Sequence, residues 1–210
     1  GLYSDISSVE IDTYLAETAA ALTVEHPDYS YLAARIKVNS LHKETPGFII
    51  ATKNLYDDGL LREEYFKKVM ENADAIESII DYDKDYTFDY FALTTLIRAY
   101  LLKFDNRTIE RPQDLWMRVT LTVTGNEFNL DKIKETYKSL SSGMYTHATP
   151  TLFNSGLKMQ QLSSCFLIGM EDDSIEGIFN TIKDCALISK TAGGIGMHAH
   201  NVRGSGSRIK

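Results

Sequence analysis

The chain has 210 residues, enough for one domain of ordinary size or two small ones. It is 43% hydrophobic and 24% charged, which is typical of a globular protein, and no apolar stretch approaches the ~20 residues of a membrane span. The formal net charge is -7 without any dense run of Lys and Arg, so we expect neither nucleic-acid binding nor membrane association.

The first two thirds of the chain are predicted to be helical. Ser7 and Glu10 form a capping box ahead of a helix over 11–22, and Pro27 suits the first turn of a second helix that ends at Pro46 and Gly47. Further helices are predicted over the ranges 48–56, 63–80, 88–101, 112–123 and 130–142. Breaks are expected at 57–59 and 125–126, and Asp105-Asn106 indicates a turn between two short β-prone pieces within 103–108.

The pattern changes after Pro150. The apolar run 162–170 predicts a strand buried on both faces, 174–190 predicts a helix, and 195–202 predicts a second strand parallel to the first through a right-handed crossover. The fold class is therefore mainly α, with a helical region followed by one βαβ unit. Because one such unit cannot cover its own sheet, we expect the chain to be the N-terminal piece of a longer protein.

Four motifs occur in the last third of the chain. They are Thr149-Pro-Thr-Leu-Phe-Asn-Ser-Gly, Leu162-Ser-Ser-Cys-Phe, Asp172-Asp-Ser-Ile-Glu-Gly and Lys190-Thr-Ala-Gly-Gly-Ile-Gly. Their order and spacing closely resemble the start of the catalytic core of the large subunit of class I ribonucleotide reductases, and the resemblance extends back to Ser8. It implies the end of an ATP-cone-like regulatory domain over 1–46, an all-α domain over 47–150 and, over 151–210, the start of a ten-stranded α/β barrel.

Cys165 and Cys185 are the two cysteines, too few for a disulfide scaffold, so we expect a cytoplasmic protein with reduced thiols. Taken alone, Cys165 would be a small buried thiol. The resemblance implies instead that it is the catalytic cysteine that delivers reducing equivalents together with a second thiol, and that this partner and a radical-carrying cysteine lie beyond Lys210. Cys185, on the apolar stretch of its helix, is expected to be a core residue.

Hydroxyls and glycines surround this cysteine in the motifs. Thr149 and Ser164 would ordinarily serve as turn and cap residues, and Gly193 and Gly194 as a helix end with a tight turn. The resemblance implies that these four residues contact the substrate.

Asp173 and Glu176 occupy N-cap and N3 positions in a capping-box variant at the start of the helix over 174–190. The resemblance implies that this helix start also binds a nucleotide that sets specificity, and the residues expected to contact it are Asp173, Ser174, Ile175, Lys190, Arg203 and Lys210. It also implies a homodimer through the apolar side of this helix, formed by Ile175, Ile178, Phe179 and Ile182. Burial of that side within one subunit is an equally open alternative.

Near the N-terminus, Ser8, Asp12 and Lys43 match positions of the family's ATP-cone that touch adenine or phosphates. The cone's basic motif is absent here, so an incomplete activity site or simple helix-surface charges are both open. His198 and His200 share one side of a predicted strand, but no third ligand is evident and we expect no metal site.

The resemblance implies reduction of ribonucleoside diphosphates by radical chemistry with a redox dithiol. The implied effectors are ATP, dATP, dTTP and dGTP, and the implied partners are thioredoxin or glutaredoxin and a small subunit that carries the radical metal cofactor. No cofactor is expected in this chain, which should be inactive alone. The alternatives are a cobalamin-dependent reductase and a non-catalytic nucleotide-binding regulatory module, and the sequence after Lys210 would separate the three.

Overall fold

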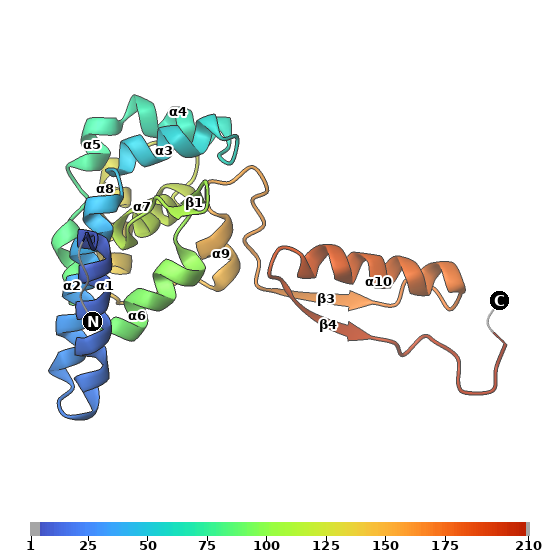
Figure 1. Ribbon diagram of the computed structural model, residues 1–210. Coiled ribbons are helices and arrows are strands. Elements are labelled where there is room, and N and C mark those ends of the chain that lie inside the picture. Colours follow the sequence, from blue (N-terminus) through green and yellow to red (C-terminus); the bar gives the residue numbers. More distant parts are fainter. Residues whose placement is uncertain (1–4, 209–210) are drawn as a thin grey trace. The chain divides into compact units, whose positions relative to one another are not determined.

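The computed structural model describes residues 5–208 (Figure 1). These residues form two compact units. The first runs up to Thr146 and includes Gly156–Lys158, and the second comprises His147–Ser155 and the chain from Met159 onward.

The first unit is mainly helical, as predicted, and the range 88–101 that was predicted as one helix is divided into an α-helix and a π-helix. Its α-helices are α1 (Ser8–Ala21), α2 (Asp28–Glu44), α3 (Phe48–Asp57), α4 (Glu63–Glu71), α5 (Ala73–Glu77), α6 (Tyr90–Thr95), α7 (Pro112–Val123) and α8 (Leu130–Ser141). The shorter elements are η1 (Leu22–Val24), η2 (Tyr82–Thr87), the π-helical η3 (Leu96–Tyr100), and strands β1 (Lys103–Phe104) and β2 (Arg107–Thr108). The capping box of α1 is confirmed, with the Glu10 N–H donating to Ser7 Oγ and the Ser7 N–H donating to Glu10 Oε2.

The single helix predicted over 63–80 is wrong, because the structure breaks it between α4 and α5. Asn72 lies at the break with φ -127° and ψ 23°, outside helical geometry. Its side-chain Nδ2 donates to the Lys68 carbonyl at 2.8 Å, the acceptor that the Asn72 N–H would use in a continuing helix. Such competition by a short polar side chain favours helix ends over helix interiors.

The turn between β1 and β2 has positive φ at both central residues, 47° at Asp105 and 60° at Asn106. This is the geometry of a type I′ turn, which suits a two-residue hairpin. The two strands pair antiparallel with Phe104 opposite Arg107, and the turn between two short β-prone pieces that the sequence predicted is confirmed. Arg107 directly follows this turn, so the turn fixes the backbone position of Arg107.

Helix α7 lies in the core of the first unit, and every residue from Pro112 to Leu121 is buried. Asp114, near its start, is held by hydrogen bonds within the chain, as buried polar groups usually are. Asp114 accepts from the Tyr82 hydroxyl at 2.6 Å and from the Arg111 N–H at 2.9 Å. Arg111 in turn donates from Nη2 to the carbonyls of His42 and Thr45 at 3.2 and 2.7 Å, which attaches the end of α2 to the start of α7.

Asp114 predicts a specific pH dependence of stability. Burial raises the pKa of its carboxyl to about 7 from an ordinary value of 3.8, against the opposing effect of the hydrogen bond from Tyr82. Between these two values the folded chain holds a proton that the unfolded chain has released, so Asp114 makes stability fall as pH rises from about 4 to 7. Asp114→Asn cannot titrate, and its unfolding free energy should fall less over this range. Urea titrations followed by the fluorescence of Trp116, the single Trp, measure this; an unchanged slope would contradict the assignment.

The second unit contains α9 (Thr149–Asn154), β3 (Cys165–Gly169), α10 (Ile175–Ser189) and β4 (Gly194–His198). The two strands are parallel with Cys165 opposite Gly194, and α10 connects them and packs along the sheet, which confirms the predicted βαβ unit (Figure 1). Helix α9 was not predicted. The expectation that the first strand is buried on both faces is wrong for the described chain, since Leu167 is 93% exposed. One helix covers one face of a two-stranded sheet and leaves the other open.

Within residues 5–208, no helix combines the length and apolarity needed to cross a bilayer.

Candidate functional site

Cys165 opens β3 and is exposed as a free thiol. The neighbouring Ser164 hydroxyl donates toward Cys165 Sγ at 3.6 Å. The Ser164 carbonyl accepts from the Gly194 N–H at 2.7 Å, the bond that joins the start of β3 to the start of β4. A thiol, a hydroxyl and the glycine loop therefore share one end of the parallel sheet.

The two glycines of this loop lie in close contact with neighbouring residues. A Cβ on Gly193 would lie 2.6 Å from Ile188 Cγ2 and 2.9 Å from the Phe166 ring. A Cβ on Gly194 would lie 3.1 Å from the Ser164 carbonyl oxygen. Because glycine has no Cβ, the backbone of this loop can approach the Ser164 carbonyl closely.

Helix α9 is attached to the same end of the sheet through side chains that the sequence reasoning did not single out. Thr151 Oγ1 donates to the Leu162 carbonyl at 3.0 Å, and Asn154 Nδ2 donates to the Gln161 carbonyl at 2.7 Å. Gln161 Nε2 reaches Thr191 Oγ1 at 3.4 Å, just before the glycine loop. Thr149 is the first residue of this helix, so the network fixes where its hydroxyl lies relative to the segment that enters β3.

At the start of α10 the predicted cap is displaced by one residue. Ser174, not Asp173, is the N-cap, and its Oγ accepts from the Gly177 N–H at 3.0 Å. The Asp173 carboxylate instead forms an ion pair with Arg203 Nε and accepts from the Arg203 N–H at 3.3 Å. The structure thus brings Asp173 and Arg203 together beside Ser174 and Ile175.

Gly177, in the first turn of α10, packs against the chain that precedes the helix. A Cβ there would meet the backbone N and O of Asp172 at 2.6 Å. The sequence reasoning did not single out this glycine, although its place in the Asp172-Asp-Ser-Ile-Glu-Gly motif is a usable signal.

Lys190 is not brought near Asp173 within one chain. It is the C-cap of α10, whose 15 residues span roughly 22 Å at 1.5 Å per residue. Lys210 lies outside the described residues.

The apolar side of α10 is open to solvent in the described chain. Ile175, Phe179 and Ile182 are 63%, 65% and 51% exposed. Burial of these three side chains by the described part of one subunit is therefore wrong. Cys185 is only half-buried, which corrects its expected place in the core.

In the first unit, Lys43 Nζ donates to Asp12 Oδ2 at 3.0 Å, so two of the three residues matched to the ATP-cone form an ion pair with each other. Ser8 is the exposed first residue of α1. In the second unit, the Nδ1 atoms of His198 and His200 lie 2.7 Å apart, within hydrogen-bonding distance of each other.

Two family descriptions match consecutive parts of the chain. Residues 86–160 match "Ribonucleotide reductase, all-alpha domain" and residues 163–210 match "Ribonucleotide reductase, barrel domain". Together with the helical first unit and the parallel β3–α10–β4 arrangement, they support an all-α domain followed by the start of a barrel domain.

Among curated relatives, the chain is 46% identical over 219 residues to the ribonucleoside-diphosphate reductase large chain 2 of Saccharomyces cerevisiae. It is 45% identical to the large chain of Schizosaccharomyces pombe and 45% identical to the large subunit of Arabidopsis thaliana. Each match covers 100% of this chain and 25%, 27% and 27% of the respective relatives. The chain thus spans about a quarter of the length of the relatives it matches.

Proposed function

The chain belongs to the ribonucleotide reductase large-subunit family, and on that premise we propose that the full-length protein reduces ribonucleoside diphosphates to deoxyribonucleoside diphosphates. The observation that carries the proposal is the exposed Cys165 thiol at the end of β3, beside the Ser164 hydroxyl and the glycine loop of β4. In this proposal, 1–46 is the end of an ATP-cone-like domain, 47–150 is the all-α domain and 151–210 begins the barrel.

Cys165 is one of the two thiols that supply electrons. The two thiols lose two electrons and two protons and become a disulfide, while the substrate loses its 2'-hydroxyl as water and gains a hydrogen at that carbon. An external dithiol such as thioredoxin or glutaredoxin then restores the pair by thiol–disulfide exchange. A small subunit supplies the radical that starts the reaction, and the second thiol and the radical-carrying cysteine belong to parts of the protein outside this chain.

The substrate is held by short polar groups around the thiol. The hydroxyls of Ser164 and Thr149 and the backbone of Gly193 and Gly194 are proposed to contact its ribose and diphosphate. The close passage of the glycine loop behind Ser164 supports this role, since a backbone without Cβ atoms can approach a ligand closely.

A nucleoside triphosphate effector, with ATP, dATP, dTTP and dGTP as the candidates, is proposed to bind at the start of α10. Asp173, Ser174, Ile175 and Arg203 supply one side of this site. Lys190 lies at the opposite end of the helix, so a single chain does not provide it to the same ligand. An antiparallel pair of α10 helices across a two-fold axis would bring the partner's Lys190 to the Asp173 end, and the exposed apolar side of α10 supports such a dimer.

Mixed dimers test whether this effector site is shared between subunits. In full-length protein, Asp173→Asn and Lys190→Gln should each weaken dTTP binding about tenfold or more, since each removes a charge-assisted contact. A dimer that combines the two variants has one doubly altered site and one intact site. An equimolar mixture should therefore recover about a quarter of all sites at the original affinity, because half of the dimers are mixed. If calorimetric titrations detect no sites with the original affinity, the shared site is contradicted. Asp173 and Lys190 of one subunit would then contact the same ligand, or would not contact the effector.

The reductase activity itself is tested by assaying the full-length protein with a small subunit, a dithiol and an effector for deoxynucleotide formation. Activity that needs cobalamin instead of a small subunit would favour the cobalamin-dependent class. Effector binding without any product would favour a regulatory module. The 210-residue chain alone should form no product, because it supplies only one of the thiols.

A further inference from the structure

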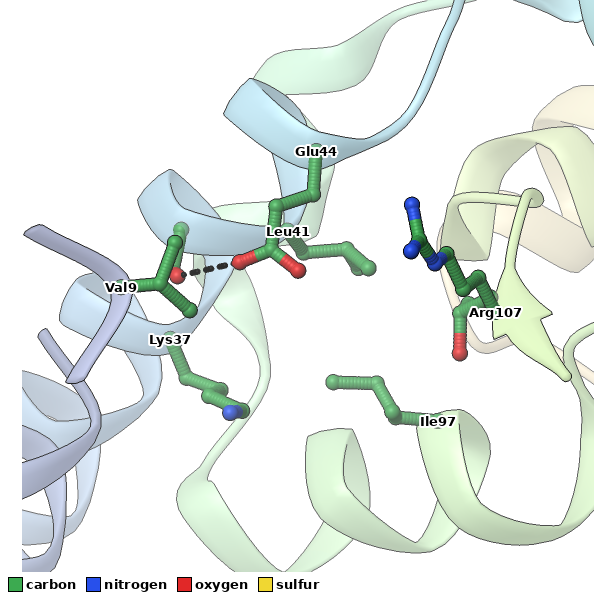
Figure 2. Close-up of a pocket in the computed structure, with 8 residues that line it drawn as sticks. Val9, Lys37, Leu41, Glu44, Ile97 and Arg107 are labelled. Atoms are coloured by element: carbon green, nitrogen blue, oxygen red, sulfur yellow. Dashed lines mark hydrogen bonds between the residues drawn. The ribbon is translucent and has the colours of Figure 1, made fainter. Parts of the chain in front are cut away.

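A cavity of about 520 Å³ opens in the first unit between the helical hairpin of α1 and α2 and the segment that carries η3 and β2 (Figure 2). Its lining residues are Val9, Lys37, Ser40, Leu41, Glu44, Ile97, Arg107 and Thr108. The volume falls within the range of small-molecule sites, roughly 300–1,000 Å³. None of the residues proposed above for substrate, effector or the ATP-cone remnant lines this cavity.

Two cations and one carboxylate border the cavity, although the chain as a whole carries a net charge of -7. Figure 2 shows the Arg107 guanidinium and the Glu44 carboxylate facing the same space, with Lys37 on another side. Glu44 Oε1 accepts from the Ser40 hydroxyl at 3.0 Å. Within residues 5–208, Lys37 and Arg107 make no ion pair with a carboxylate, so the two positive charges are available to an anion.

The remaining wall provides apolar surface and hydroxyls. Leu41 is buried and Ile97 half-buried, and both side chains border the space shown in Figure 2. Thr108 follows Arg107 on β2. The Arg107 position is fixed by the type I′ turn, and a second cavity of about 210 Å³ shares Glu44, Arg107 and Thr108 with the first. The cavity thus combines two cations, a carboxylate that can accept a hydrogen bond and an apolar surface.

We propose that this cavity binds a small organic phosphate. A dianionic phosphate matches the two cations, and the planar guanidinium of Arg107 suits phosphate oxygens in particular. The Glu44 carboxylate would accept from a hydroxyl or amino group of the ligand, and the body of the ligand would lie on Leu41 and Ile97. A nucleoside monophosphate and a sugar phosphate share this chemistry.

The test is calorimetric titration of the full-length protein with AMP, ribose 5-phosphate and inorganic phosphate. Lys37→Gln and Arg107→Gln should each weaken binding of at least one organic phosphate about tenfold. Matched controls remove a cation outside the cavity, one from the same helix as Lys37 and one from the strand that pairs with the strand of Arg107. Arg35→Gln lies on α2 and Lys103→Gln on β1, and both should bind within about twofold of the unaltered protein.

Lys43→Gln separates this cavity from the proposed ATP-cone remnant. Loss of binding in Lys43→Gln but not in Lys37→Gln would place the ligand at the remnant and overturn the proposal. Absence of saturable binding by all three probes would overturn it, as would equal losses in the controls. Reductase activity measured on the same proteins reports on the proposed function separately, because no lining residue belongs to the substrate site.

Discussion

Replacing Cys165 by serine is expected to abolish multiple turnover by the full-length protein when a dithiol is the reductant. Serine keeps the approximate size and a polar atom at the end of β3, but its hydroxyl cannot form or exchange a disulfide. The exposure of the thiol next to Ser164 means that the substitution should not disturb packing. The rate of deoxynucleotide formation over many cycles is the measurement.

Cys185→Ser is the matched control within the same unit. Cys185 is half-buried on α10 and lies on a different element from Cys165, so its variant should retain turnover. Its stability should fall modestly, because a hydroxyl replaces a thiol at a partly apolar position. If Cys185→Ser were inactive and Cys165→Ser active, the assignment of the reducing thiol would be reversed.

Local signals in the sequence predicted much of the fold. The capping box at Ser7 and the proline at the start of α7 each act within one helical turn, and α7 has the predicted bounds Pro112–Val123. The glycine breaks are confirmed by the positive φ of 76° at Gly59 and 91° at Gly125. These features depend on backbone geometry that neighbouring residues determine.

The sequence did not predict features that depend on tertiary contacts, or on competition between a side chain and the backbone for the same hydrogen-bond acceptor. At the break, the Asn72 side chain donates to the Lys68 carbonyl in place of the Asn72 backbone N–H. The helical periodicity of 63–80 gives no sign of this hydrogen bond. Helix α9 has only six residues, too short for a periodic pattern, and side-chain bonds to the segment before β3 hold it.

In the candidate site, too, features set by local sequence signals were predicted and features set by distant contacts were not. The order of the motifs predicted that Ser164 and Cys165 start one strand and that Gly193 and Gly194 come just before the next. The parallel pairing of β3 with β4 brings these two segments together. The cap at Asp173 was predicted one residue too early, because Ser and Asp cap almost equally well and the contact with Arg203 is 30 residues away in sequence. The separation of Lys190 from Asp173 follows from helix length alone and could have been predicted.

The largest expected loss of stability comes from Arg118→Met in α7. Arg118 and Glu110 are 1% and 2% exposed and form a bidentate ion pair at 2.5 and 3.1 Å. Glu110 Oε2 also accepts from the Leu102 N–H at 2.9 Å, so this carboxylate holds the chain ahead of β1. Removing the guanidinium leaves a buried, uncompensated carboxylate, which should cost about 3–5 kcal/mol.

That loss is a large part of the ~5–15 kcal/mol by which single domains are stable, so Arg118→Met should unfold at much lower urea. Glu110→Gln combined with Arg118→Met removes both charges, and the double variant should be more stable than the sum of the two single losses predicts. Lys43→Met provides the control, because its ion pair with Asp12 is solvent-exposed on the lysine side and should contribute no more than about 1 kcal/mol. Urea unfolding followed by Trp116, two residues from Arg118, measures the unaltered chain, the single variants Arg118→Met, Glu110→Gln and Lys43→Met, and the double variant. Equal losses in Arg118→Met and Lys43→Met would mean that burial does not set the energy of the Glu110 pair.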